Sequence, residues 1–144
     1  MTLRTISPRE ASIFACVADT AVAPEPVLPP VRDTDAAFFF DDWMTLSPRL
    51  FEFGMRALMY AIELAPFAFG FRHRLRRLPV EQRAEALRRL EKSPVIQVRQ
   101  IAKLVKSMAF LAYYGDDRIL LRCGYDADAN LRRGRELRAA EGRP

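Results

Sequence analysis

Residues 112–126 read Ala-Tyr-Tyr-Gly-Asp-Asp-Arg-Ile-Leu-Leu-Arg-Cys-Gly-Tyr-Asp, and from this stretch we derive the expected architecture. Gly115 follows a long apolar pattern of helical spacing and can adopt the left-handed conformation that ends a helix. The Asp116 carboxylate can then cap a short helix over 118–123, which Gly124 ends. A long and a short helix joined by a tight turn predict a helical protein.

Upstream of this turn, Ser-Pro pairs mark further helix starts. They occur at 7–8, 47–48 and 93–94, each time ahead of apolar residues at helical spacing. A serine hydroxyl can accept a hydrogen bond from a first-turn amide, and a proline there costs no helical bond. Glu10 completes a capping box with Ser7. We therefore predict that helices begin at these three places.

Taken over residues 1–144, the pattern predicts a single compact all-α domain of six to seven helices. The expected helices cover 8–22, 34–46, 47 to beyond 66, 79–90, 94–114, 118–123 and 127–140, and Pro66 should kink or end the third of them. Between the first two lies a proline-rich arm over 24–32, with four prolines between 24 and 30. Such a segment should be extended and stiff. It can lie across its own domain or serve as a proline-rich ligand for a partner. The last helix continues into a basic C-terminal segment, 127–144.

Apolar positions suggest which helix faces turn inward. In the helix from 47, we expect an inner face that includes Leu50, Gly54, Leu58 and Ala61. Three consecutive phenylalanines at 38–40 cannot share one face, because each helical step turns about 100°. At least one of them should lie between neighbouring elements or on a contact surface.

Composition restricts the class of partner only weakly. The net charge is +5, so an acidic protein surface, nucleic acid or anionic lipid could each be attracted. No apolar run reaches about 18 residues, so no membrane span is expected. Residues 1–8 resemble no signal peptide, which favours a cytoplasmic location. Cys16 and Cys123 have no metal-binding spacing and are expected to be small buried thiols.

Residues that could carry chemistry are few. His73 is the only histidine and lies among arginines, which disfavour its protonated form and repel metal ions. The neighbouring carboxylates at 41–42 and 116–117 diverge around a helix, so capping or arginine pairing explains them. The chain shows no glycine-rich phosphate loop and no nucleophile beside a base. We therefore expect a protein that is no enzyme and binds no metal or cofactor.

The segment 67–77 combines aromatic and basic side chains. Its candidate contact residues are Phe67, Phe69, Phe71, Arg72 and Arg74. Phenylalanines beside arginines can enter a lipid interface or an apolar pocket of a partner rimmed by acids. The alternative is a buried loop with a solvated charged side. The alternating phenylalanines could also form a strand, but no second strand candidate exists to pair with it.

Three features together resemble subunit 3, the gamma subunit, of gluconate 2-dehydrogenase. They are the capped helix from Ser7, the proline-bearing segment 24–30, and the Tyr113-Tyr114 turn that leads through a short helix to Gly124-Tyr125. The resemblance covers most of the chain. The three tyrosines carry it best, and we expect their hydroxyl groups to make contacts outside the domain.

The resemblance implies a non-catalytic accessory subunit. Members of that family accompany a large flavin-dependent dehydrogenase of the glucose-methanol-choline type, usually with a cytochrome subunit, and hold no redox cofactor themselves. FAD is thus expected in the partner, and any association with a membrane would occur through that partner. Many members carry a twin-arginine export signal, which is absent from this sequence. A cytoplasmic role in stabilising or assembling the dehydrogenase is therefore expected.

The alternative function is that of a small basic helical protein that binds nucleic acid or an anionic membrane surface by itself. Nucleic acid is the less expected of these ligands, because phenylalanines without interleaved hydrogen-bonding groups are poorly suited to sequence recognition.

Overall fold

The computed structural model describes residues 2–24 and 26–142, and in these ranges it is all-α, as the sequence predicts. The seven α-helices are α1 (Pro8–Val22), α2 (Ala36–Leu46), α3 (Arg49–Ala68), α4 (Val80–Glu91), α5 (Ile96–Tyr114), α6 (Asp117–Arg122) and α7 (Ala127–Ala140). Two short 3-10 helices, η1 (Val31–Asp33) and η2 (Leu75–Arg77), precede α2 and α4. The described residues form no strand, so the alternating phenylalanines after Pro66 do not pair as one.

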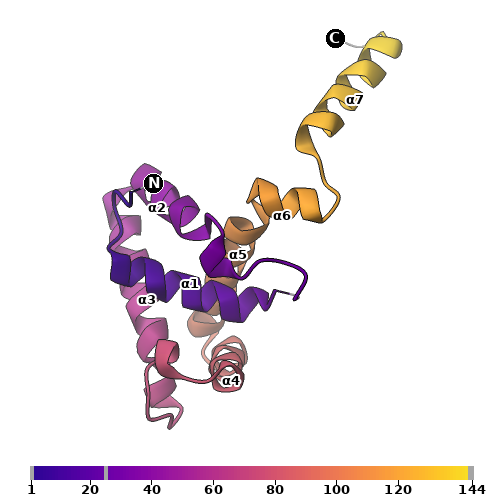
Figure 1. The fold of residues 1–144 in the computed structure, drawn as a ribbon. Coiled ribbons are helices and arrows are strands. Elements are labelled where there is room, and N and C mark those ends of the chain that lie inside the picture. Colours follow the sequence, from indigo (N-terminus) through magenta and orange to yellow (C-terminus); the bar gives the residue numbers. More distant parts are fainter. Residues whose placement is uncertain (1, 25, 143–144) are drawn as a thin grey trace.

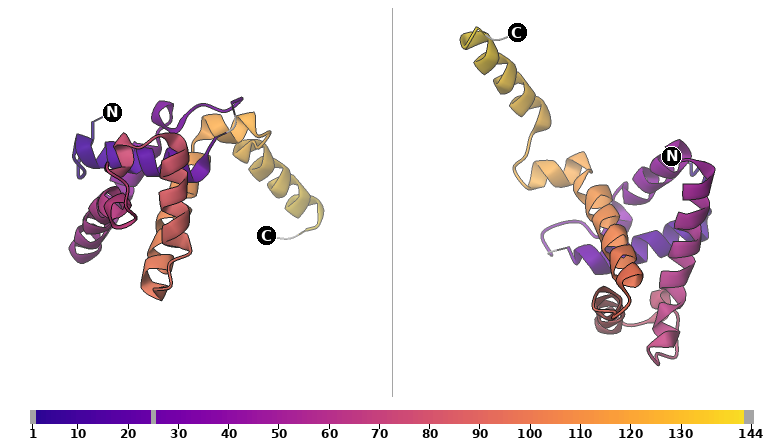
Figure 2. Two further views of the ribbon diagram at one scale, coloured as in Figure 1. Left: turned by 90° about the horizontal axis from the view of Figure 1, so that it is seen from below. Right: turned by 180° about the vertical axis from the view of Figure 1, so that it is seen from behind.

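Helix α1 is the centre of the fold. It packs against α2, α3, α4 and α5, and it lies in front of α3 and α5 in Figure 1. The view from behind shows α3 and α5 on the near side and α1 beyond them (Figure 2). Ile13 and Phe14 of α1 are fully buried, and the Phe14 ring stacks on Phe40 of α2 with 4.2 Å between ring centroids. The hydrophobic core therefore lies around α1, and α3 and α5 each keep one side free of it.

Two of the helix ends have the expected side-chain caps. The Ser7 hydroxyl accepts a hydrogen bond from the Glu10 amide at 3.3 Å, and the Glu10 carboxylate accepts one from the Ser7 amide at 2.7 Å. This capping box confirms the predicted start of α1. Asp116 caps α6 as predicted, because its carboxylate accepts from the Arg118 amide at 2.9 Å.

Three predictions about helix ends are wrong in detail. Ser47 does not cap α3, since its hydroxyl donates to the Trp43 carbonyl at 2.8 Å and thus closes α2. Helix α5 begins at Ile96 rather than Pro94. Gly115 is right-handed, with φ of −80°, so it is not a left-handed stop. A Cβ atom there would lie 2.6 Å from the Leu111 carbonyl oxygen, and this close approach is what requires glycine.

The proline-rich arm is less extended than predicted. Its described residues turn at 26–27 and enter η1, while residue 25 lies outside the described ranges. The arm lies on its own domain, which was one of the two expected placements. The Tyr113 hydroxyl donates to the Pro29 carbonyl at 2.7 Å, and the Arg122 guanidinium donates to the Val27 carbonyl at 3.1 Å.

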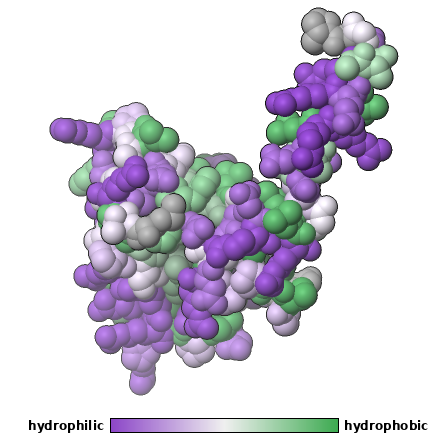
Figure 3. All heavy atoms as spheres, turned by 45° about the horizontal axis from the view of Figure 1, so that its top comes forward, coloured by the Kyte–Doolittle hydropathy of each residue, from purple (hydrophilic) through white to green (hydrophobic). Residues whose placement is uncertain are grey.

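Helix α7 projects away from the other helices (Figures 1 and 2). It covers residues 127–140 as predicted, and none of its residues is buried. Residues 143–144 of the predicted basic tail lie outside the described ranges. On the face drawn in Figure 3, hydrophilic side chains cover most of α7 and surround separate apolar patches on the body.

Candidate partner-binding surface

The structure places the three predicted contact tyrosines in different environments. Tyr113 is fully buried and its hydroxyl binds Pro29 inside the chain, so the expected contact of this hydroxyl outside the domain is wrong. Tyr114 and Tyr125 are 38% and 50% exposed. The reason is helical geometry: Tyr113 continues the inner stripe of α5, while Tyr114 is turned by about 100° from it.

The segment 67–77 is divided in a similar way. Phe67 is exposed, whereas Phe69 and Phe71 are half-buried against the core. The Arg89 guanidinium lies 5.9 Å from the Phe69 ring centroid and 5.6 Å from that of Phe71. Arg72 is exposed and Arg74 is half-buried. In Figure 1 this segment follows the lower end of α3, whereas the C-terminal end of α5 lies higher, beside α6, so the predicted contact residues form no single site.

A further surface, which the sequence prediction assigned to the core, lies on α3. Helix α3 contains four charged residues, Arg49, Glu52, Arg56 and Glu63. At 100° per residue they fall within about 60° of the helix circumference. A sector centred about 100° around the helix from these charges is apolar and exposed. In it, Leu50 is 84% exposed, Phe53 71% and Leu64 52%. The predicted inner face of α3 is therefore wrong at Leu50, Gly54 and Ala61, which face solvent.

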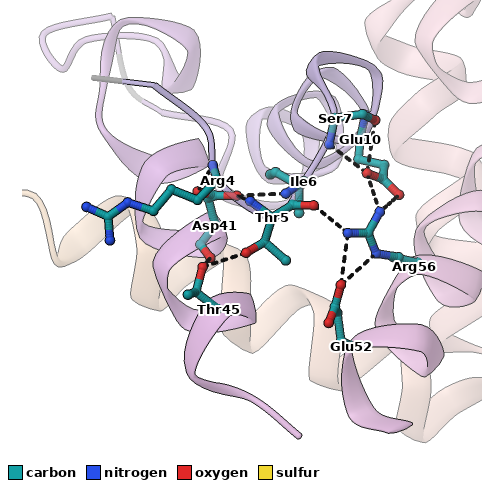
Figure 4. Close-up of polar contacts among 9 residues, drawn as sticks. All are labelled: Arg4, Thr5, Ile6, Ser7, Glu10, Asp41, Thr45, Glu52 and Arg56. Carbon is teal, nitrogen blue, oxygen red and sulfur yellow. Dashed lines mark hydrogen bonds and ion pairs between the residues drawn. The ribbon is translucent and has the colours of Figure 1, made fainter. Parts of the chain in front are cut away.

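Two charged residues of α3, Arg56 and Glu63, are held towards the protein by partners on other elements, whereas Arg49 is exposed. The Arg56 guanidinium binds both Glu10 oxygens and one Glu52 oxygen at 2.9 Å, and it also donates to the Thr5 carbonyl (Figure 4). Glu63 is 1% exposed and forms an ion pair with Arg76 at 2.9 Å. Burial of a carboxylate is tolerated only with such partners.

A second anchor holds the chain ahead of α1. The Asp41 carboxylate of α2 accepts hydrogen bonds from the backbone amides of Arg4, Thr5 and Ile6 at 2.7, 2.9 and 2.7 Å (Figure 4). Burial opposes ionisation of Asp41, but these three hydrogen bonds outweigh it and lower its pKa. Residues 4–6 and Arg56 therefore fix the orientation of α3 relative to α1, which turns the apolar side of α3 outward.

A groove runs between the apolar side of α3 and helix α5. One hollow of about 560 Å³ lies between Leu50, Gly54 and Leu58 of α3 and Ile101 and Leu104 of α5. A second hollow of about 160 Å³ continues from it towards Ala65 and shares Leu58 and Ile101 with it. No charged or hydrogen-bonding side chain lines either hollow. We call these two hollows the α3–α5 groove.

No constellation typical of catalysis accompanies the groove. Among the described residues, no group of three His, Cys, Asp or Glu side chains could hold a metal ion. No helix in residues 2–24 and 26–142 is long and apolar enough to cross a membrane.

The two cysteines are free, with Cys16 half-buried and Cys123 exposed, so the expectation of a buried thiol is wrong for Cys123. The carboxylates of Asp41 and Asp116 are used for backbone anchoring and capping.

Acid should destabilise the fold through the anchored carboxylates. Arg118 holds the pKa of Asp116 at about 2, and the Ser7 and Arg56 hydrogen bonds outweigh burial to lower that of Glu10. The folded pKa values lie below the ordinary 3.8 of Asp and 4.5 of Glu, so these groups stabilise the protein above about pH 4 to 5, and this stability is lost as the pH falls through the folded pKa values. Urea unfolding at about pH 5, 4 and 3 should show a falling midpoint. A constant midpoint would contradict this assignment.

The buried tyrosine gives a second stability prediction. Tyr113→Phe removes the hydrogen bond to Pro29 and should lower the free energy of unfolding by about 1 kcal/mol. Tyr114→Phe is the matched control, because its hydroxyl makes no hydrogen bond with the described residues and should cost little. Urea unfolding compares the two variants. Equal stabilities would show that the arm is not held through this hydroxyl.

Comparison with known proteins adds no relative: no family model, curated protein or solved structure matches this chain.

Proposed function

We propose that this chain is a non-catalytic accessory subunit that stabilises or matures a flavin-dependent dehydrogenase of the glucose-methanol-choline type. FAD belongs to that larger partner, and the present chain contributes a binding surface and no reactive group. A cytochrome subunit can complete the same complex.

The exposed apolar surface of α3 and α5 carries this proposal. Its large side chains are between 39% and 84% exposed: Leu50, Phe53, Leu64, Phe67, Ile101, Leu104 and Leu111. At about 200 Å² for each fully exposed side chain, the seven together expose on the order of 800 Å². Leu50, Ile101 and Leu104 among them lie side by side in the α3–α5 groove. An apolar surface larger than a few hundred Å² is unusual on a monomer and is typical of a binding site.

The kind of partner comes from the resemblance to the gluconate 2-dehydrogenase subunit. Two of the features that carry this resemblance meet in the structure, because Tyr113 of the Tyr-Tyr turn binds Pro29 of the proline-bearing segment. This contact explains why both features would occur together in one chain. The contact between Tyr113 and Pro29 supports the likeness to that family. The exposed apolar side chains support a role in binding a partner.

Affinity purification from the native host tests the proposal. The tagged chain should recover a protein with the absorbance spectrum of bound flavin, in equal amount and at moderate salt. An apolar interface should resist added salt, since screening acts on charges. A chain that is recovered alone under these conditions would count against the accessory role.

The same experiment separates the alternative function. Arg72, Arg74 and Arg77 form no ion pair with the described residues and could attract phosphate groups. Binding to nucleic acid through such arginines would weaken steeply as salt rises. Other basic groups already form ion pairs with carboxylates of the same chain: Arg56 with Glu10, Arg76 with Glu63, and Arg89 with Glu85. This internal pairing favours the accessory role.

A further inference from the structure

We propose that one end of the molecule, made by residues 67–106, binds the surface of an anionic phospholipid bilayer directly. We call this part the basic end. It comprises the last two residues of α3, the 3-10 helix η2, all of α4 and the first part of α5. The inference goes beyond the accessory role, because this peripheral contact requires no partner protein.

The positive charge of the chain is concentrated at the basic end. Residues 67–106 contain eleven arginines and lysines and three glutamates, a net charge of +8, whereas the rest of the chain sums to −3. The end of α3, helix α4 and the start of α5 lie together at the lower end of the molecule, both in Figure 1 and in the view from behind in Figure 2. Clusters of about four to eight arginines and lysines are typical of segments that bind anionic lipid headgroups.

A hollow at the basic end joins segments that are separate in the chain. It measures about 370 Å³ and lies between Phe69, which follows α3, and the turn at 92–94 between α4 and α5. Among the described residues that line it, three are cationic and one, Glu85, is a carboxylate, which gives a net charge of +2. Lys92 is exposed in this lining and forms no ion pair with the described residues. The hollow therefore attracts the phosphate groups of a bilayer surface.

Exposed apolar side chains come directly before and after the lining of this hollow in the chain. Phe67, two residues before Phe69, is 50% exposed. Val95 and Ile96, which follow the turn at 92–94, are 49% and 58% exposed. At a bilayer surface such side chains enter the boundary between headgroups and acyl chains, while neighbouring arginines and lysines stay among the headgroups. The basic end offers both kinds of side chain together.

The apolar side chains favour a bilayer over other anionic partners. Nucleic acid would bind the arginines through phosphate groups, but aliphatic side chains such as Val95 and Ile96 provide no aromatic ring on which bases stack. An acidic protein would need an apolar pocket for each exposed side chain, at the spacing that the ends of two helices impose. A fluid bilayer accepts apolar side chains at any spacing along its surface.

Cosedimentation of the full chain with lipid vesicles tests the inference. The probe is a vesicle of phosphatidylcholine with about one-third phosphatidylserine, and vesicles of phosphatidylcholine alone are the reference. The chain should bind the anionic vesicles about tenfold more tightly at low salt, and added salt should reduce this difference. Equal binding to both kinds of vesicle, or no binding to the anionic ones, overturns the inference.

Two charge variants test whether the basic end makes the contact. Lys92→Gln removes one charge from the hollow and should weaken binding to the anionic vesicles about fivefold. Arg49→Gln is the matched control, because it removes one exposed charge at the other end of α3, about 28 Å away along the helix, and should leave binding unchanged. Equal weakening in both variants would mean that the total charge governs binding, and this overturns the inference.

Two apolar variants separate a bilayer from the other partners. Ile96→Gln should weaken vesicle binding about fivefold, since a buried apolar side chain is lost from the contact. Leu137→Gln makes a similar change on α7, where the side chain is 57% exposed, and should have no effect. Unchanged vesicle binding by Ile96→Gln overturns the inference. So does tighter binding to duplex DNA or to polyglutamate than to the anionic vesicles, because nucleic acid or an acidic protein would then be the partner.

The accessory role and the membrane contact fail separately. Recovery of a flavoprotein by a chain that binds no vesicles would retain the accessory role and reject the membrane contact. Vesicle binding by a chain that recovers no flavoprotein would retain the membrane contact and reject the dehydrogenase as the partner.

Discussion

Asp41→Ala is expected to lower the free energy of unfolding by about 3 kcal/mol, which corresponds to roughly 10 °C in Tm. The carboxylate is 2% exposed and accepts from three consecutive backbone amides, all of which lose their partner in the variant. The Ile6 amide is buried and cannot turn to water unless the segment detaches. Amide exchange at residues 4–6 should therefore accelerate, and urea unfolding should give the loss of stability.

The neighbouring residue supplies the control for this variant. Asp42 has a 62% exposed side chain and lies 4.0 Å from the Arg4 guanidinium, a surface pair of little energetic value. Asp42→Ala should leave both the urea midpoint and the exchange of residues 4–6 close to those of the wild type. If both variants behave alike, the three hydrogen bonds of Asp41 do not anchor this segment.

Glu63→Ala should be at least as destabilising, by about 3–5 kcal/mol. The Glu63 carboxylate is 1% exposed and binds Arg76 at 2.9 Å. Its loss leaves a partly buried guanidinium, 23% exposed, without a carboxylate, and it also leaves a cavity. Because this pair joins α3 to η2, urea unfolding and near-UV circular dichroism should both report the change.

Glu85→Ala is the matched control on the surface. Glu85 forms ion pairs with Arg88 and Arg89 on α4, where the side chains are exposed to water. Its removal should change the urea midpoint far less than Glu63→Ala does. A similar loss in both variants would mean that burial of the Glu63 pair does not matter for stability.

Local chemistry made much of the helical architecture predictable. The capping box at Ser7 and the carboxylate cap at Asp116 were recognisable, because each depends on residues a few positions apart. The bounds of α7 were also predicted correctly. The three phenylalanines at 38–40 do not share one environment, as helical geometry requires, since Phe40 is buried and Phe39 is exposed. Ser47 was misassigned because a hydroxyl can bond forwards as a cap or backwards to the preceding helix.

The candidate site was not predictable by the same reasoning. A hydrophobic stripe of helical spacing indicates that a face becomes buried, but it does not distinguish the protein's own core from a partner. On α3 the buried residues are Met55, Met59, Ile62, Glu63 and Pro66. Arg56 and Glu63 found partners inside the fold, and apolar residues such as Leu50 were left outside. Those partners, Glu10 and Arg76, are 46 and 13 residues away. Only the fact that all four charges of α3 share one side could have suggested this arrangement.

Helix α7 has a consequence for how the protein unfolds. None of its fourteen residues is buried, so its helix receives no support from the core and depends on local propensity alone. A helix of about this length is only marginally stable in water. Its helix–coil equilibrium should therefore be gradual and separate from the cooperative transition of α1 to α6, so that α7 adds length to the molecule without adding cooperativity.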